Sequence, residues 1–330
     1  HEFPASVHAL GPVRGSYGYS GRYVPWLKEN RARFDAVVVH GLWQYSSFGA
    51  WRALHGTATP YFVFPHGMLD PWFKRTYPLK HVKKMFYWPW GEYRVLRDAA
   101  AVLFTSEEEK RQARESFALY HAKEVVVNYG TATPEVDWAA AQEEFFAKFH
   151  ELRGQKFFLF LGRLHEKKGA DLLIQAFASL GEKHGRLVIA GPCADDSYRQ
   201  QLRELARGLP VTFTGMLSGN LKWGALRAAD VFVLPSHQEN FGIAIAEALA
   251  CGTPVLISDK VNIWREVVKD GGGYAESDDL AGTKRLLERW LAVTPAMRAE
   301  MSARARNSFA RRFEINQAVD SFLEVLQSAR

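Results

Sequence analysis

Nine short, almost unbroken runs of apolar, β-favouring residues constrain the fold of this chain more than any other feature. Four lie in the first half, at 36–40, 61–64, 101–104 and 125–127, and five in the second, at 157–161, 187–189, 211–213, 231–234 and 255–257. Such runs are typical of parallel strands covered on both faces. Helical patterns separate them in the second half, at 171–180, 198–208, 220–229 and 241–250. The alternation predicts an α/β fold in which a doubly wound parallel sheet is built twice.

The length of 330 residues also favours two domains, because single cores rarely grow beyond ~250–300 residues. We expect a first domain over 1–133 and a second over 156–311. The polar, Ala- and Glu-rich stretch 134–155 is expected to be a connector. Residues 312–330 carry apolar side chains at helical spacing, and we expect this helix to pack back onto the first domain.

The net charge of +6 belongs to the first domain. Residues 1–133 hold 17 basic and 11 acidic residues, whereas the remainder holds 25 of each. This asymmetry favours an anionic partner such as nucleic acid, a phospholipid surface or a phosphorylated substrate. A basic face that only keeps the protein in solution is the alternative.

Two further features bear on location. Two cysteines exclude a disulfide scaffold and a four-cysteine zinc site, and they fit a reducing compartment. No apolar run approaches the ~18 residues that a membrane-spanning helix needs, and no secretory signal is recognised at the start. We expect a cytoplasmic protein.

The most specific motif follows the run at 231–234. Residues 237–242 (HQENFG) open a helix that contains Glu247. Free backbone N–H groups at a helix N-terminus attract phosphate, and the carboxylates of Glu239 and Glu247 accept hydrogen bonds from hydroxyl groups. The alternative is that Glu239 is only a helix-terminal charge and Glu247 only a surface residue.

A second motif, GRLHEKKG at 162–169, follows the first strand of the second half. A glycine turn followed by Arg163 and Lys168 suits a diphosphate. The stretch is neither the dinucleotide fingerprint nor a P-loop. A basic surface turn is the alternative.

Together with AGP at 190–192, FTG at 213–215 and ALACGTPV at 248–255, these motifs resemble the retaining glycosyltransferases of family 4 (glycosyl transferases group 1). The resemblance covers about 36–326 and is strongest over 157–260. It implies the GT-B fold, in which two Rossmann-like domains face each other across a cleft. It also implies sugar transfer from a UDP-, GDP- or ADP-linked donor to a glycan or lipid-linked acceptor, with no cofactor.

The resemblance assigns roles to individual residues. Arg163 and Lys168 would hold the diphosphate and stabilise the departing nucleotide, Glu239 would bind sugar hydroxyls, and Glu247 would accept from the ribose. The remaining donor-binding positions are Gly191, Gly215, Met216, Leu217, Asn240, Phe241 and Gly242. The implied catalytic set is His66, Glu239, Arg163 and Lys168, with His40 a weaker candidate beside His66; a capping role for His66 is the alternative.

No metal is expected. The sequence lacks an Asp-x-Asp motif, and the adjacent pairs 195–196 and 278–279 are interpreted as solvated loop residues. Retention through a covalent intermediate and same-face attack within a short-lived ion pair both remain open.

The chain departs from the family pattern at its start. Members normally open with a strand, a glycine-rich loop and a helix, but only 35 residues precede Ala36 here. We therefore expect a first domain shortened at its N-terminus. A crippled or non-catalytic nucleotide-sugar-binding protein is the alternative function.

Basic and aromatic residues interleave over 72–94. This composition is typical of a peripheral segment at an anionic membrane surface, here the inner face of the membrane. Buried aromatic rings with solvated lysines are the alternative. No nucleic-acid module accompanies the stretch, so nucleic acid is not an expected partner.

Overall fold

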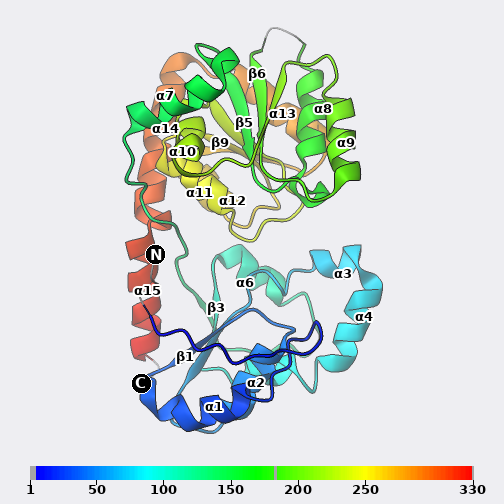
Figure 1. Ribbon diagram of the computed structural model, residues 1–330, viewed down its shortest axis with the longest axis vertical. Coiled ribbons are helices and arrows are strands. Elements are labelled where there is room, and N and C mark those ends of the chain that lie inside the picture. The colour runs from blue at the N-terminus through cyan, green and yellow to red at the C-terminus, as the bar shows by residue number, and fades with distance from the viewer. Residues whose placement is uncertain (1–4, 182–183, 329–330) are drawn as a thin grey trace. The chain divides into compact units, whose positions relative to one another are not determined.

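The computed structural model describes residues 5–181 and 184–328, without the side chains of Phe73 and Arg75. The chain forms two compact units, residues 1–127 with 321–330 and residues 128–320 (Figure 1). Each unit is built on a parallel sheet with helices packed around it, so the predicted α/β class is confirmed. The last two residues of the expected helix 312–330 lie outside the described part.

The sheet of the first unit contains β1 (Val37–His40), β2 (Tyr61–Phe64), β3 (Ala101–Phe104) and β4 (Glu124–Val126) in that order. Every neighbouring pair is parallel. All residues of β2 and β3 are buried, which explains their unbroken apolar character. The helical segments are α1 (Tyr23–Asn30), η1 (Arg31–Arg33), α2 (Tyr45–Leu54), α3 (Trp72–Thr76), α4 (Pro78–Tyr87), α5 (Glu92–Arg97) and α6 (Glu107–Ala113).

The C-terminal helix α15 (Ile315–Ser328) supplies part of the core of the first unit. Its side chains Phe322, Val325 and Leu326 pack against a buried cluster that includes Phe62 and Phe64. The chain therefore returns to its first unit at its end.

The sheet of the second unit has the order β10-β9-β8-β5-β6-β7, again parallel throughout. The strands are β5 (Phe157–Leu161), β6 (Arg186–Ala190), β7 (Val211–Gly215), β8 (Val231–Leu234), β9 (Val255–Ser258) and β10 (Gly273–Glu276). The chain runs outward from β5 to β7 and then returns to place β8 on the other side of β5. In sheets of this kind, ligands bind beyond the carboxyl ends of the strands at such a reversal.

The helical segments of the second unit surround this sheet. They are α7 (Trp138–Lys148), η2 (His150–Leu152), η3 (Glu166–Lys168), α8 (Ala170–Ala178), α9 (Asp196–Leu205), α10 (Gly219–Ala228), α11 (Ile243–Ala250), α12 (Trp264–Lys269), α13 (Leu280–Leu291), α14 (Pro295–Ser308) and the π-helical η4 (Phe309–Phe313). No helix in the described part of the chain has the length and apolar character needed to cross a bilayer.

Helix α7 lies within the stretch expected to connect the domains. Its Ala141 and Phe145 are fully buried in the second unit. A Cβ at Gly224 of α10 would lie 2.1 Å from the Ala141 carbonyl oxygen, so a glycine lets the two helices approach closely. Residues 138–148 are therefore part of the second unit rather than a separate connector.

Candidate functional site

The loops that follow β5 and β8 meet at the reversal of the second sheet. Gly169 adopts a φ of +69°, and a Cβ there would lie 2.3 Å from the Pro235 carbonyl oxygen. The Ser236 hydroxyl and the His237 backbone N–H both donate to the Lys167 carbonyl, at 3.0 and 2.8 Å. These contacts hold the two predicted motifs side by side.

Lys168 and Glu239 form an ion pair across these loops, with their side chains only 19% and 16% exposed. The Glu239 backbone is also fixed, because its N–H donates to Lys260 and its carbonyl accepts from Asn262, both at 3.0 Å. The structure thus brings together a cation and a carboxylate that lie 71 residues apart in the sequence.

Arg163 is exposed, and its guanidinium makes no ion pair with any described residue. Its loop is fixed at the backbone, where the Leu164 N–H donates to Pro192 at 2.9 Å. Gly191, with a φ of +143°, belongs to the facing loop, and a Cβ there would lie 1.8 Å from the Gly162 carbonyl oxygen. Gly191 therefore permits the close approach of the loops after β5 and β6.

Glu247 lies on α11 and is 9% exposed, so it is not the surface residue of the alternative interpretation. Its Oε1 is 2.7 Å from the Nζ of Lys222 on α10. The motif analysis did not single out Lys222, because only the packing of α10 beside α11 brings this lysine to Glu247.

The loop that leads into α11 contains a glycine with a positive φ and a buried aromatic ring. Gly242 adopts a φ of +78° directly before the helix. The ring of Phe241 is buried against Tyr129 and Phe313, with ring centroids 5.0 and 5.7 Å away. Only backbone groups of Phe241 are thus left to face a ligand, while the Asn240 amide oxygen accepts from Asn262 at 3.3 Å.

The predicted base-flanking residues follow β7. Gly215 has a φ of +71°, and its carbonyl accepts from the Gly191 N–H at 2.8 Å. Met216 is 71% exposed, whereas Leu217 is buried in the core. This turn therefore offers backbone groups and one exposed, adaptable apolar side chain.

The acidic pairs expected in solvated loops serve mainly as helix caps. Asp195 accepts from Tyr198 N–H at the start of α9, and Asp279 accepts from Gly282 N–H at the start of α13. Asp278 instead lies 2.9 Å from the Nδ1 of His237. Over residues 5–181 and 184–328, no group of three or more His, Cys, Asp or Glu side chains is arranged to hold a metal ion.

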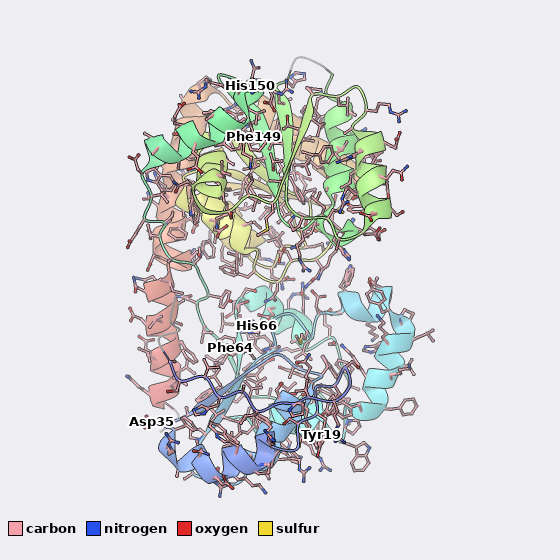
Figure 2. All side chains as sticks on the ribbon, in the orientation of Figure 1. Tyr19, Asp35, Phe64, His66, Phe149 and His150 are labelled. Atoms are coloured by element: carbon pink, nitrogen blue, oxygen red, sulfur yellow. The ribbon has the colours of Figure 1, made fainter. Side chains whose placement is uncertain are left out.

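His66 directly follows β2 in the first unit, two residues beyond Phe64 (Figure 2). Its φ of +50° is unusual for a residue with a side chain. The parallel register of β1 and β2 pairs His40 with Phe64, which brings the His40 Nδ1 within 2.9 Å of the His66 Nε2. Burial lowers the pKa of both imidazoles, and His40 lowers that of His66 further, which favours the neutral form of each ring.

The loop of His66 is held by Glu109, which the sequence analysis missed. Its carboxylate accepts from Gly67 N–H at 2.7 Å and from the Thr105 N–H and hydroxyl at 2.8 Å. The sequence did contain a signal for Glu109, because Ser106 and Glu109 have the spacing of a capping box. Ser106 does cap α6. Here the glutamate fastens the adjacent loop as well.

Family models match both units of the chain. The model described as Glycosyl transferases group 1 matches residues 141–308, and the Glycosyl transferase 4-like domain matches residues 2–130. Among curated proteins, the chain is 30% identical over 253 residues to the GDP-mannose-dependent alpha-(1-6)-phosphatidylinositol dimannoside mannosyltransferase of Mycobacterium tuberculosis, covering 74% of this chain and 62% of that protein. It is 30% identical over 256 residues to the D-inositol 3-phosphate glycosyltransferase of Nocardiopsis dassonvillei, covering 72% and 58%. The chain thus spans about 60% of the length of these relatives.

Solved structures show the same fold. Sucrose-phosphate synthase from Thermosynechococcus elongatus superposes with a TM-score of 0.75 at 21% identity, over 94% of this chain and 78% of that one. Anabaena HepE in complex with UDP and glucose gives 0.74 at 16% identity, over 92% and 81%. Two parallel-sheet α/β units with charged loops beyond their strands place the chain in the GT-B class. Within that class, the chain belongs to the family of glycosyl transferases group 1.

Proposed function

We propose that this protein is a retaining glycosyltransferase that moves a sugar from a nucleoside-diphosphate sugar to a glycan or lipid-linked acceptor. The observation that carries the proposal is the ion pair of Lys168 with Glu239 beyond the reversal of the second sheet, next to the loop of Arg163, whose exposed guanidinium makes no ion pair with a described residue. Two cations beside a carboxylate match a ligand that carries two phosphoryl groups and a sugar with hydroxyls. The relatives that act on GDP-mannose and on inositol phosphate agree with this chemistry.

The two cations would also stabilise the negative charge that develops during the reaction. Negative charge develops on the nucleoside diphosphate as its bond to the sugar breaks, and fixed cations lower the barrier by stabilising that charge. In our proposal Arg163 and Lys168 fill this role without a catalytic metal or a cofactor. Departure and attack on the same face of the sugar then give retention.

In the proposal, the remaining site residues bind the other parts of the donor and the transferred sugar. Glu239 accepts hydrogen bonds from sugar hydroxyls, and Glu247 accepts them from the ribose. Gly215, Met216 and Leu217 flank the base, which is the uracil, guanine or adenine of the donor. His66, a neutral imidazole held by its loop and by His40, contacts the transferred sugar.

Calorimetric titration with UDP, GDP and ADP, followed by a transfer assay with the matching sugar nucleotides, tests this function. We expect one diphosphate to bind best and its sugar conjugate to be consumed with retention at the anomeric carbon. Failure of all three to bind would refute the donor site. Binding without transfer to any glycan or lipid-linked acceptor would instead identify a nucleotide-sugar-binding protein.

The segment 72–94 supports a peripheral membrane location at the inner leaflet. Leu79, Phe86 and Trp90 are 81%, 78% and 68% exposed, and Lys83 is exposed among them. Trp88 is buried, so the aromatic residues divide between core and surface. Exposed apolar side chains with neighbouring lysines fit the headgroup region of an anionic leaflet.

Cosedimentation with phosphatidylglycerol vesicles at low salt tests this location. Phe86→Glu is expected to abolish binding, because it places an anion on the face that would enter the bilayer. Met297→Glu, which changes an exposed methionine on α14, serves as the control. Equal sedimentation of both variants and the parent would exclude the segment as the contact.

A further inference from the structure

Helix α10 places a cation against the carboxylate that we assign to the ribose. The Nζ of Lys222 lies 2.7 Å from the Oε1 of Glu247 on α11, and the two side chains are only 22% and 12% exposed. The same Nζ lies 4.0 Å from the centroid of the Trp223 ring. None of the roles proposed above involves Lys222, so its place beside Glu247 needs a separate explanation.

Glu247 is the one charged residue of an otherwise apolar helix. Its neighbours on α11 are buried aliphatic side chains, namely Ile245, Ala246, Ala248 and Leu249. A carboxylate loses hydration in such surroundings, and the ammonium of Lys222 compensates its charge. A mostly buried ion pair, however, often stabilises a fold no more than apolar side chains of similar size would. Stability alone is therefore a weak reason for this pair.

The packing of α10 beside α11 has other supports (Figure 1). The Arg227 guanidinium of α10 donates to the Cys251 carbonyl at the end of α11, at 2.8 Å. The Thr253 hydroxyl donates to the Leu226 carbonyl of α10 at 2.6 Å. Helix α10 also packs closely against α7 through its glycine, as described above. Because these contacts do not involve Lys222, replacing this lysine is compatible with folding.

Lys222 engages only one oxygen of the Glu247 carboxylate. The other oxygen, Oε2, bonds to no described residue and keeps some exposure to solvent. Helix α10 begins at Gly219, shortly after the turn 215–217 that we expect to flank the base. Lys222 is the fourth residue of this helix, so it lies within one helical turn of that end. The lysine thus fixes the carboxylate while one of its oxygens stays available as an acceptor.

We propose that Lys222 is a positioning residue of the donor site, which holds Glu247 so that its Oε2 accepts from the ribose hydroxyls and thereby selects ribonucleotides. This inference rests on the proposed function and adds to it a selection for the pentose of the nucleotide. A carboxylate that is already fixed loses little freedom when the ribose binds, whereas ordering a free side chain lowers affinity roughly two- to tenfold. Lys222 also offsets the negative charge of Glu247, which would otherwise repel the phosphates of the donor.

Calorimetry on the full chain tests the inference. The probes are whichever of UDP, GDP and ADP binds best and its 2′,3′-dideoxy analogue, which lacks both ribose hydroxyls. We expect the parent to bind the ribonucleotide roughly tenfold or more tightly than the analogue. Lys222→Met and Lys222→Gln should each lower this preference roughly two- to tenfold, whereas Lys222→Arg, which keeps the cation, should retain most of it. Since the preference is a ratio within one variant, a general change in phosphate affinity cancels.

Arg298→Met is the matched control. Arg298 forms an ion pair with Asp230 at 2.5 Å, and the two side chains are 18% and 22% exposed. Asp230 directly precedes β8, at the amino edge of the sheet and away from the donor site. This variant should keep the preference of the parent. Glu247→Gln completes a double-mutant cycle, in which Lys222→Met should have no further effect on the preference.

The outcomes separate this inference from the function on which it rests. If the parent binds a nucleoside diphosphate but shows no preference for the ribonucleotide, the inference is overturned and the donor site stands. The same holds if Lys222→Met and Lys222→Gln keep the preference of the parent, or if Arg298→Met lowers it equally. Failure of the parent to bind UDP, GDP or ADP overturns the proposed function and this inference with it.

Discussion

Replacing Arg163 with alanine separates donor recognition from stability. Arg163 is exposed and has no ion-pair partner among the described residues, so its removal leaves no buried charge uncompensated. The backbone of its loop stays fixed by the bond from Leu164 to Pro192. We expect the melting temperature to remain within experimental error of the parent.

The affinity for nucleoside diphosphate should fall sharply. A hydrogen bond from a charged guanidinium to phosphate contributes about 1.5–3 kcal/mol, which corresponds to a rise in Kd of roughly 10- to 150-fold. Calorimetry on Arg163→Ala with the preferred diphosphate gives this value directly. The difference should shrink as salt is added, because Arg163 is solvent-exposed.

The matched control is Arg203→Ala. Arg203 lies on α9, is exposed and, like Arg163, makes no ion pair with a described residue. Like Arg163→Ala, the Arg203→Ala substitution removes one positive charge from the second unit, but it leaves the loops beyond the strands unchanged. If both variants raise Kd equally, the effect is one of net charge, and the assignment of Arg163 to the diphosphate is refuted.

Two further changes test the structural reasoning. Gly191→Ala should strongly destabilise the second unit in thermal denaturation, because its Cβ would lie 1.8 Å from the Gly162 carbonyl oxygen. Gly154→Ala, at a φ of +74° but with nothing within 4 Å of its Cβ, should cost only about 1 kcal/mol, and equal losses would contradict the packing argument. Burial raises the pKa of Glu92 from 4.5 to about 7, so ionising it destabilises the folded state and stability should decline by about 3 kcal/mol between these pH values. Glu92→Gln should remove that part of the decline in denaturant titrations across this range, and an unchanged pH profile would refute the link.

The strands were predictable because most of them are buried on both faces. β10 was not predicted, since Gly273–Glu276 is an edge strand that pairs only with β9 and mixes Tyr274 and Ala275 with a partly exposed glutamate. The bounds of α4 were also foreseeable, because Pro78 occupies its first turn and Pro89 lies two residues beyond its last residue, Tyr87. The membership of α7 in the second unit was not, since it depends on the tertiary contact between Ala141 and Gly224.

The positions of the candidate site residues also differ in how far the sequence predicts them. Arg163, Lys168 and Glu239 follow predicted parallel strands, whose carboxyl ends lie at one edge of a sheet, so their placement at a shared edge was predictable. The proximity of His40 and His66 follows from the parallel pairing of β1 with β2. The contact of Lys222 with Glu247 depends on how α10 packs beside α11, which short motifs do not encode. Whether the named residues bind donor stays a prediction for the experiments above.

The two glutamates assigned to the donor already have lysine partners, Lys168 for Glu239 and Lys222 for Glu247. These pairs are mostly buried, and breaking one without replacement would leave an uncompensated charge. A diphosphate that draws Lys168 away from Glu239 therefore raises the free energy of that carboxylate unless another donor reaches it. The hydroxyls of an attached sugar would supply such donors to Glu239, whereas the ribose hydroxyls of a free nucleoside diphosphate are assigned to Glu247 instead. If these residues bind the donor as proposed, recognition of the phosphates and of the sugar would be coupled through one ion pair, and the complete donor would bind more tightly than the separate contributions of its parts predict.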